Sequence, residues 1–193
     1  TRASDLVGHW DLNEGALTIA ADSSASDKNG TLEGDPQWVA GKFGQGLQLD
    51  GDDYVHVVGF DKLNNQGAAA VSFWVNPTPA NAGYAFWADG ISLIEIESGK
   101  NFRVRWHLQN AWRGTYVTSP NSVVASDWAH WVFDFNGGTT TIYKDGVSLA
   151  TGTDAEVTFS NLGTDLFLGW RSATNGVQGV VDDYRVYNVS LTA

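Results

Sequence analysis

The segment Thr139–Thr151, TTTIYKDGVSLAT, gives the clearest single signal of the fold. Two short strand-like runs, Thr139–Tyr143 and Val147–Thr151, flank the residues Lys-Asp-Gly. Asp-Gly accepts the positive φ angles of a tight type I′ turn, so the segment predicts a β-hairpin. The same pattern of short runs and turn residues continues in both directions along the chain.

Alternating or apolar runs, separated by Gly, Asn and Asp, predict strands from one end of the chain to the other, and no window has helical periodicity. The other predicted strands are Leu6–Leu12, Gly46–Leu49, Tyr54–Val58, Ala69–Val75, Ala85–Ala88, Ile91–Glu97, Phe102–Leu108, Thr115–Thr118, Trp128–Phe135, Glu156–Phe159, Leu166–Trp170 and Val177–Tyr187. Many strands without helices indicate an all-β sandwich or barrel. We predict a single antiparallel β-sandwich domain over residues 1–193, with its core at about 6–189.

Composition excludes several classes of protein. The 193 residues are 42% hydrophobic and include nine Trp, which is typical of an ordered globular domain with a large core. Cysteine is absent, so the chain has no disulfide, thiolate metal site or Cys nucleophile. The net charge of −11 argues against nucleic acid or a membrane surface as partner, since both are polyanions. No run of about 18 apolar residues could span a bilayer.

Positive charge gathers in the stretch 100–114, KNFRVRWHLQNAWRG. It holds four of the eleven Lys and Arg residues, and no Asp or Glu occurs from Ser98 through Ser126. Period-two alternation places Arg103, Arg105 and His107 on one face of a strand. Arg103 can pair across a hairpin with Glu95 or Glu97, but two carboxylates cannot neutralise the whole run. The remaining charge favours an anionic partner.

Several stretches resemble the laminin-G-like, concanavalin A-type jelly rolls. These stretches, in order, are Leu6–Gly15, Asp22–Ser24, Asn29–Leu32, Gly41–Val55, Val71–Val75, Trp128–Val132, Thr141–Gly152 and Gly179–Asn188. The resemblance implies a jelly-roll fold of the kind used as carbohydrate-binding modules, as adhesion domains and occasionally in enzymes. Trp10, Trp74, Trp131, Phe73 and Phe133 are predicted core residues. Gly41, Gly44, Gly46 and Gly51 are predicted to permit bends and close backbone approach.

We predict a non-catalytic carbohydrate-binding module that recognises a polysaccharide, preferably an anionic uronate or sulfated glycan. Tryptophans would stack on the apolar faces of sugar rings, and arginines would bind carboxylate or sulfate groups through charge-assisted hydrogen bonds. The predicted ligand-binding residues are Trp87, Asp89, Arg103, Arg105, His107, Trp112, Arg113, Trp170 and Arg171. In each Trp-Arg couple, alternation lets only one of the two side chains reach a ligand.

A structural calcium ion is implied by the family resemblance. Asp22, Asp182 and Asp183 are the predicted ligands, joining the two ends of the chain through one ion, with Asp11 and the carbonyls of Asn29-Gly30 as possible additions. Calcium is bound by carboxylate and carbonyl oxygens, which these residues supply. The alternative is that Asp182 and Asp183 only hydrogen-bond a neighbouring loop and that Asp22 opens an Asx turn.

Catalysis finds little support in the sequence. The E-x-D-x-x-E strand of the glucanase relatives is missing, and Glu95 with Glu97 lacks a third acid. His107 with Arg103, Arg105 and Tyr116 could imitate the site of a jelly-roll polysaccharide lyase, which stays a less favoured alternative. An adhesion domain that binds a protein is the other alternative. We expect the module to be secreted and attached to a polysaccharide-degrading or adhesive protein, with no nucleic-acid or membrane partner.

Overall fold

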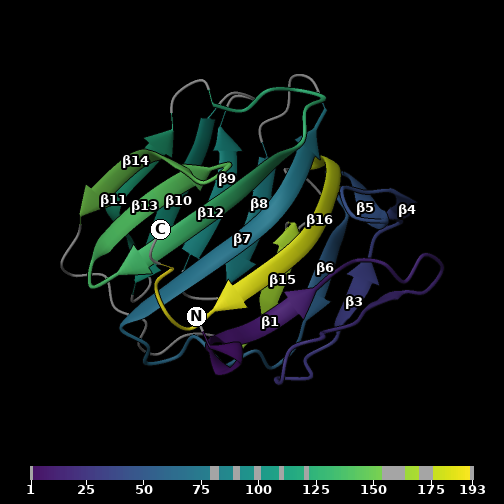
Figure 1. Cartoon of the computed structure of the whole chain (residues 1–193), viewed down its shortest axis with the longest axis horizontal. Helices are drawn as coiled ribbons and strands as arrows, with labels where there is room; N and C mark the ends of the chain where they lie inside the picture. Colours follow the sequence, from purple (N-terminus) through teal and green to yellow (C-terminus); the bar gives the residue numbers. More distant parts are fainter. Residues whose placement is uncertain are drawn as a thin grey trace.

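The strands of the computed structural model form two antiparallel sheets that face each other across one core (Figure 1). The structure describes residues 2–78, 83–88, 92–97, 101–108, 111–119, 122–153, 164–169 and 176–191; in β10 and β11 it describes the backbone and its register. A single 3-10 turn, η1 (Ala3–Asp5), precedes the first strand. The all-β sandwich predicted from the sequence is confirmed.

The first sheet follows the order β14 (Val147–Thr153), β13 (Thr139–Lys144), β12 (Ala129–Asn136), β7 (Ala68–Pro77), β16 (Gln178–Tyr187), β5 (Gln45–Asp50) and β4 (Gln37–Ala40), and β1 (Leu6–Trp10) also pairs with β16. The second sheet follows the order β11 (Ala111–Ser119), β10 (Asn101–Leu108), β9 (Ser92–Glu97), β8 (Gly83–Ala88), β15 (Leu166–Gly169), β6 (Tyr54–Val57), β3 (Gly30–Glu33) and β2 (Ile19–Ala20).

The predicted hairpin is confirmed by the strand register. Lys144 pairs with Val147, and the turn residues Asp145 and Gly146 both have positive φ, as a type I′ turn requires. Gly41 in the loop between β4 and β5 also behaves as predicted, because a Cβ there would collide with the carbonyl of Gln45 and with the Asp182 carboxylate. The predicted strand Glu156–Phe159 lies outside the described residues.

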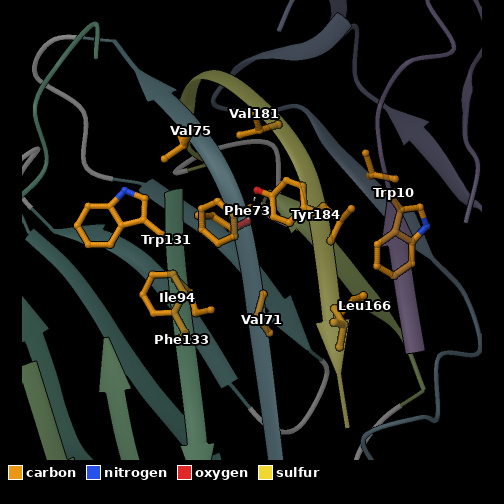
Figure 2. Close-up of a cluster of buried hydrophobic side chains, with 14 of the residues drawn as sticks. Trp10, Val71, Phe73, Val75, Ile94, Trp131, Phe133, Leu166, Val181 and Tyr184 are labelled. Carbon is orange, nitrogen blue, oxygen red and sulfur yellow. Dashed lines mark hydrogen bonds between the residues drawn. The ribbon is translucent and has the colours of Figure 1, made fainter. Parts of the chain in front are cut away.

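Aromatic side chains from both ends of the sequence fill the core (Figure 2). Phe73 of β7 stacks on Tyr184 of β16 with ring centroids 4.7 Å apart, and Phe133 lies 5.7 Å from Phe73 on its other flank. Trp10 and Trp131 are also buried, so four of the five predicted core aromatics are confirmed. The first sheet contributes most of these rings, and the second sheet packs aliphatic side chains such as Ile94 and Leu166 against them.

Trp74 is the exception, and its assignment to the core is wrong. It is half-buried, because alternation along β7 turns its neighbours Phe73 and Val75 inward and Trp74 outward. Phe43 meets the Trp74 ring edge-on at 5.6 Å, and the Lys42 ammonium lies 4.4 Å from the ring centroid. The loop after β4 therefore covers part of this tryptophan.

A hydrogen bond from Tyr184 connects the two sheets through the core. Its hydroxyl donates to the Ala85 carbonyl of β8 at 2.9 Å. Ala85 sits at a bulge, since the register between β8 and β9 passes from Tyr84 to Phe86. The hydroxyl of the first sheet thus satisfies a carbonyl that the bulge removes from the ladder of the second.

Candidate functional site

The basic run predicted to bind a ligand forms β10 and the start of β11. Arg103 pairs with Glu95 of β9, as one of the two expected cross-strand pairings requires. Val104 pairs with Ile94, a core residue with only 2% of its surface exposed. Because paired residues share a face, positions 103 and 105 lie on the face of the second sheet opposite Ile94. We call this the outer face.

Trp112 and Arg113 occupy different faces. Trp112 pairs with His107, whereas Arg113 pairs with Trp106 of the same strand. The register therefore places Trp112 on the outer face with positions 103, 105 and 107, and Arg113 on the other side. This agrees with the expectation that only one residue of such a couple reaches a given surface.

A single cross-strand row follows the outer face from β10 to β2. Its members are Arg105, Leu93, Trp87, Phe167, His56, Thr31 and Ile19. The row brings two predicted positions, 87 and 105, into line with Phe167 and His56, which were not among the predicted ligand-binding residues. Asp89, Trp170 and Arg171 lie outside the described residues.

His56 is held rigidly in this row. Its ring is parallel to that of Phe167, with centroids 4.5 Å apart and planes 8° apart, and Tyr54 approaches Phe167 at 5.9 Å. The His56 Nε2 lies 3.0 Å from an Asp165 carboxylate oxygen. Burial alone would raise the pKa of Asp165, but hydrogen bonds from His56 and the Gly59 amide outweigh it and lower the pKa.

Both carboxylate oxygens of Asp22, a predicted calcium ligand, accept hydrogen bonds from backbone amides. One carboxylate oxygen accepts from the amides of His9 and Ser24, and the other accepts from that of Lys28, each at 2.9 Å. Asp22 itself donates its backbone amide to Asn29 at 2.8 Å. These bonds close the loop after Leu12 and match the alternative expectation for this acid.

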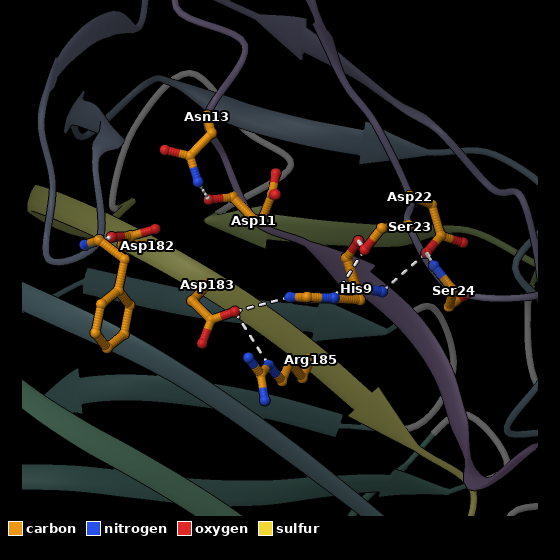
Figure 3. A network of polar contacts seen from close by, with 10 residues as sticks. His9, Asp11, Asn13, Asp22, Ser23, Ser24, Asp182, Asp183 and Arg185 are labelled. Carbon is orange, nitrogen blue, oxygen red and sulfur yellow. Dashed lines mark hydrogen bonds and ion pairs between the residues drawn. The ribbon is translucent and has the colours of Figure 1, made fainter. Parts of the chain in front are cut away.

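Asp182 and Asp183 lie at a bulge of β16 and point to different surroundings (Figure 3). Asp182 is fully buried; one oxygen accepts from the amides of Lys42 and Phe43 at 2.8 Å, and the other has no hydrogen-bond partner among the described residues. Burial raises the pKa of Asp182 despite these amides. Asp183, at φ 52°, accepts from His9 at 2.8 Å and from Arg185 at 3.0 Å. These two bonds outweigh burial and lower its pKa.

Asp22, Asp182 and Asp183 do not converge on one point. Among the described residues, the acids whose ligand oxygens lie within 4.8 Å of one another are Asp35, Asp50, Asp52 and Asp53. The link expected from calcium is made instead by His9, whose backbone amide binds Asp22 and whose ring binds Asp183 (Figure 3). The geometry gives no support for one ion held by the predicted three, and calcium stays a prediction for this chain.

His9 also lies 2.7 Å from the Ser23 hydroxyl, so Ser23, His9 and Asp183 form a chain of polar contacts. Such a chain could activate a serine only where amides are free to hold the resulting oxyanion. The Ser23 amide donates to the His9 carbonyl and the Ser24 amide donates to Asp22. The contacts therefore tie the first strand to the last, and they supply no oxyanion site from these two amides.

The concanavalin A-like lectin/glucanases superfamily model matches residues 49–193. The chain belongs to this superfamily. No curated protein sequence matches it. Solved structures of other proteins share the fold over nearly the whole chain. One of them is domain 4 of AbnA, a GH43 extracellular arabinanase from Geobacillus stearothermophilus, in complex with arabinotriose. That domain is 20% identical, with a TM-score of 0.77, and the match covers 97% of this chain and 94% of that domain.

Binding domains of botulinum neurotoxins share the fold at similar TM-scores. The receptor-binding domain of the mosaic serotype C/D is 14% identical with a TM-score of 0.78, and the binding domain of neurotoxin DC in complex with SialylT is 15% identical with a TM-score of 0.75. This chain spans about half of each toxin domain, 49% in both cases. Among the described residues no helix has the length and apolar character to cross a membrane.

Proposed function

We propose that this chain is a carbohydrate-binding module that holds an anionic polysaccharide on the outer face of the second sheet. The observation that carries the proposal is the cross-strand row, which aligns positions 105 and 87 with the rings of Phe167 and His56. Sugar rings would stack along the row, and Arg103 and Arg105 would bind carboxylate or sulfate groups. The structures of relatives with bound arabinotriose and SialylT support a saccharide ligand.

Charge supports the anionic character of the ligand. The chain carries a net charge of −11, yet the run that forms β10 and β11 contains no acid. Across β9 and β10, the basic position 103 pairs with Glu95 and the basic position 105 pairs with Leu93. Anionic sugars would be repelled by most of the surface and attracted to this end of the row.

Calorimetric titration with uronate and sulfated oligosaccharides tests the proposal. The double variant Arg103→Ala with Arg105→Ala should weaken binding at least about tenfold, because hydrogen bonds to charged groups contribute about 1.5–3 kcal/mol each. Lys62→Ala, which removes a positive charge from an exposed loop, is the matched control and should bind as the parent does. Affinity should fall with added salt. Absence of binding to every anionic and neutral glycan would refute the proposal.

A protein ligand is the second candidate. One of the similar toxin binding domains, of which this chain matches 50%, is seen in complex with rat synaptotagmin II. Binding of a protein that is lost in the arginine double variant, with no glycan bound, would favour adhesion. Release of an unsaturated product from a uronate polymer, detected by absorbance, would instead indicate a lyase.

The proposal includes three further features. The module would be secreted and would serve as an accessory domain of a larger polysaccharide-degrading protein, as domain 4 does in the extracellular arabinanase. It would also bind a structural calcium ion. The four carboxylates of Asp35, Asp50, Asp52 and Asp53 offer the oxygen donors that calcium takes.

A further inference from the structure

His56 lies near the opposite end of the row from the arginines. From β10 to β6 the row crosses four strand spacings, which is about 19 Å at about 4.8 Å for each spacing. The neighbours Val55 and Val57 are buried in the core, and the His56 side chain retains 27% of its exposed surface on the outer face. Because the row crosses about 19 Å between β10 and β6, its two ends are too far apart for a single sugar ring to contact both.

The bond to Asp165 fixes the chemistry of the imidazole. Because an ionised carboxylate only accepts, Nε2 is the donor to Asp165, and Nδ1 is then the acceptor of a neutral imidazole. In the described part of the chain Nδ1 has no partner. Asp165 is itself held by the amide of Gly59 at 3.2 Å, and Phe167 stacks on one face of the imidazole. A fixed aromatic ring with a free acceptor is suited to stack on a sugar and to accept a hydrogen bond from one of its hydroxyl groups.

The charge at this end differs from that at the arginine end. The Asp165 side chain is 30% exposed beside His56, and its lowered pKa keeps it ionised at neutral pH. A uronate or sulfate placed next to it would be repelled, whereas a neutral sugar would not. Charge complementarity thus assigns anionic sugars to β10 and neutral sugars to β6.

We propose that His56 forms a second subsite that binds a neutral sugar of the glycan whose anionic group is held at the arginine end. This inference rests on the proposed function. The ligand is then an oligosaccharide of several units, with an anionic group at the arginine end and an unsubstituted ring over His56, beside the buried Phe167. A disaccharide fills only one end of the row, so affinity rises with chain length until the ligand reaches β6.

Calorimetric titration with two probes tests this subsite: a xylobiose and a xylohexaose that each carry one glucuronate group. The parent protein should bind the longer probe about tenfold more tightly, which corresponds to one stacking contact with its hydrogen bond. His56→Ala should reduce that ratio to near one by weakening the binding of the longer probe. His56→Phe keeps a ring against Phe167 and removes Nδ1, so it should retain part of the ratio and covers the case in which His56→Ala does not fold.

His130→Ala is the matched control, because His130 packs against Trp74 on the other sheet. It should leave the length dependence intact. Unchanged length dependence in both His56 variants would overturn the second subsite while the glycan face stands. Failure of the parent protein to bind either probe would overturn the subsite, whereas the proposed function falls only if the protein binds no anionic or neutral glycan at all.

Discussion

Replacing Tyr184 by phenylalanine removes a hydroxyl group from the middle of the core. That hydroxyl is fully buried and donates at 2.9 Å to the Ala85 carbonyl, which the β8 bulge leaves outside the paired positions of β9 and β15. A buried acceptor left without its donor costs about 1–3 kcal/mol. We therefore expect Tyr184→Phe to lower the free energy of unfolding by about 1–3 kcal/mol, and the Tm by about 2–4 °C for each kcal/mol.

Urea unfolding followed by tryptophan fluorescence measures this change. The transition midpoint should fall and the slope should stay constant, because the unfolded chain exposes nearly the same surface. Tyr143→Phe is the control: Tyr143 is half-buried on β13, its hydroxyl has no hydrogen bond in the described part, and the change should stay within about 0.5 kcal/mol. Equal stabilities of the two variants would refute the assignment of the bridge between the sheets.

Three further predictions concern stability. Phe73→Ala should cost about 3–5 kcal/mol, because it opens a cavity between two stacked rings, and a smaller loss in urea unfolding would show that the core closes around it. The pKa of Asp183 is lowered in the folded protein, so its ionised form stabilises the fold above the unfolded pKa of about 3.9, and this contribution is lost as pH falls through the folded pKa. Asp183→Asn should therefore make the decline of Tm below about pH 5 shallower. An equal decline in the parent and the variant would contradict this. Calcium should raise the Tm, and Asp52→Asn should reduce that rise; a Tm insensitive to chelation would remove the ion.

Local patterns in the sequence predicted most of the fold. The Asp145-Gly146 turn and the pairing of Arg103 with Glu95 follow from residues close together in the chain, and both are found. The short strands β2, β3 and β4 were missed, because their two to four residues lie within polar loops and carry no clear alternation. Trp74 was misplaced because its run is apolar on both faces, so composition could not tell the inner face from the outer.

The candidate site was predictable only where one strand contained it. Alternation placed Arg103 and Arg105 together, but the alignment of His56 with Phe167 depends on the pairing of β6 with β15, more than a hundred residues apart. The signal present in the sequence was the position of His56 between two valines, which marks an outward side chain and names no neighbour. Likewise, the bulge at Asp183 that turns two adjacent acids apart cannot be read from the residues alone.

The first and last strands lie side by side, with Leu6 paired to Tyr187 and the Asn188 amide bound to the Asp5 carbonyl. Beyond β16 the chain turns across to β12, where Ser190 and Leu191 are fastened to Asp134. Both ends therefore depart from the first sheet (Figure 1). A linker joined to either end would leave on the side of the first sheet. In a larger protein, the outer face of the second sheet would then stay exposed to solvent.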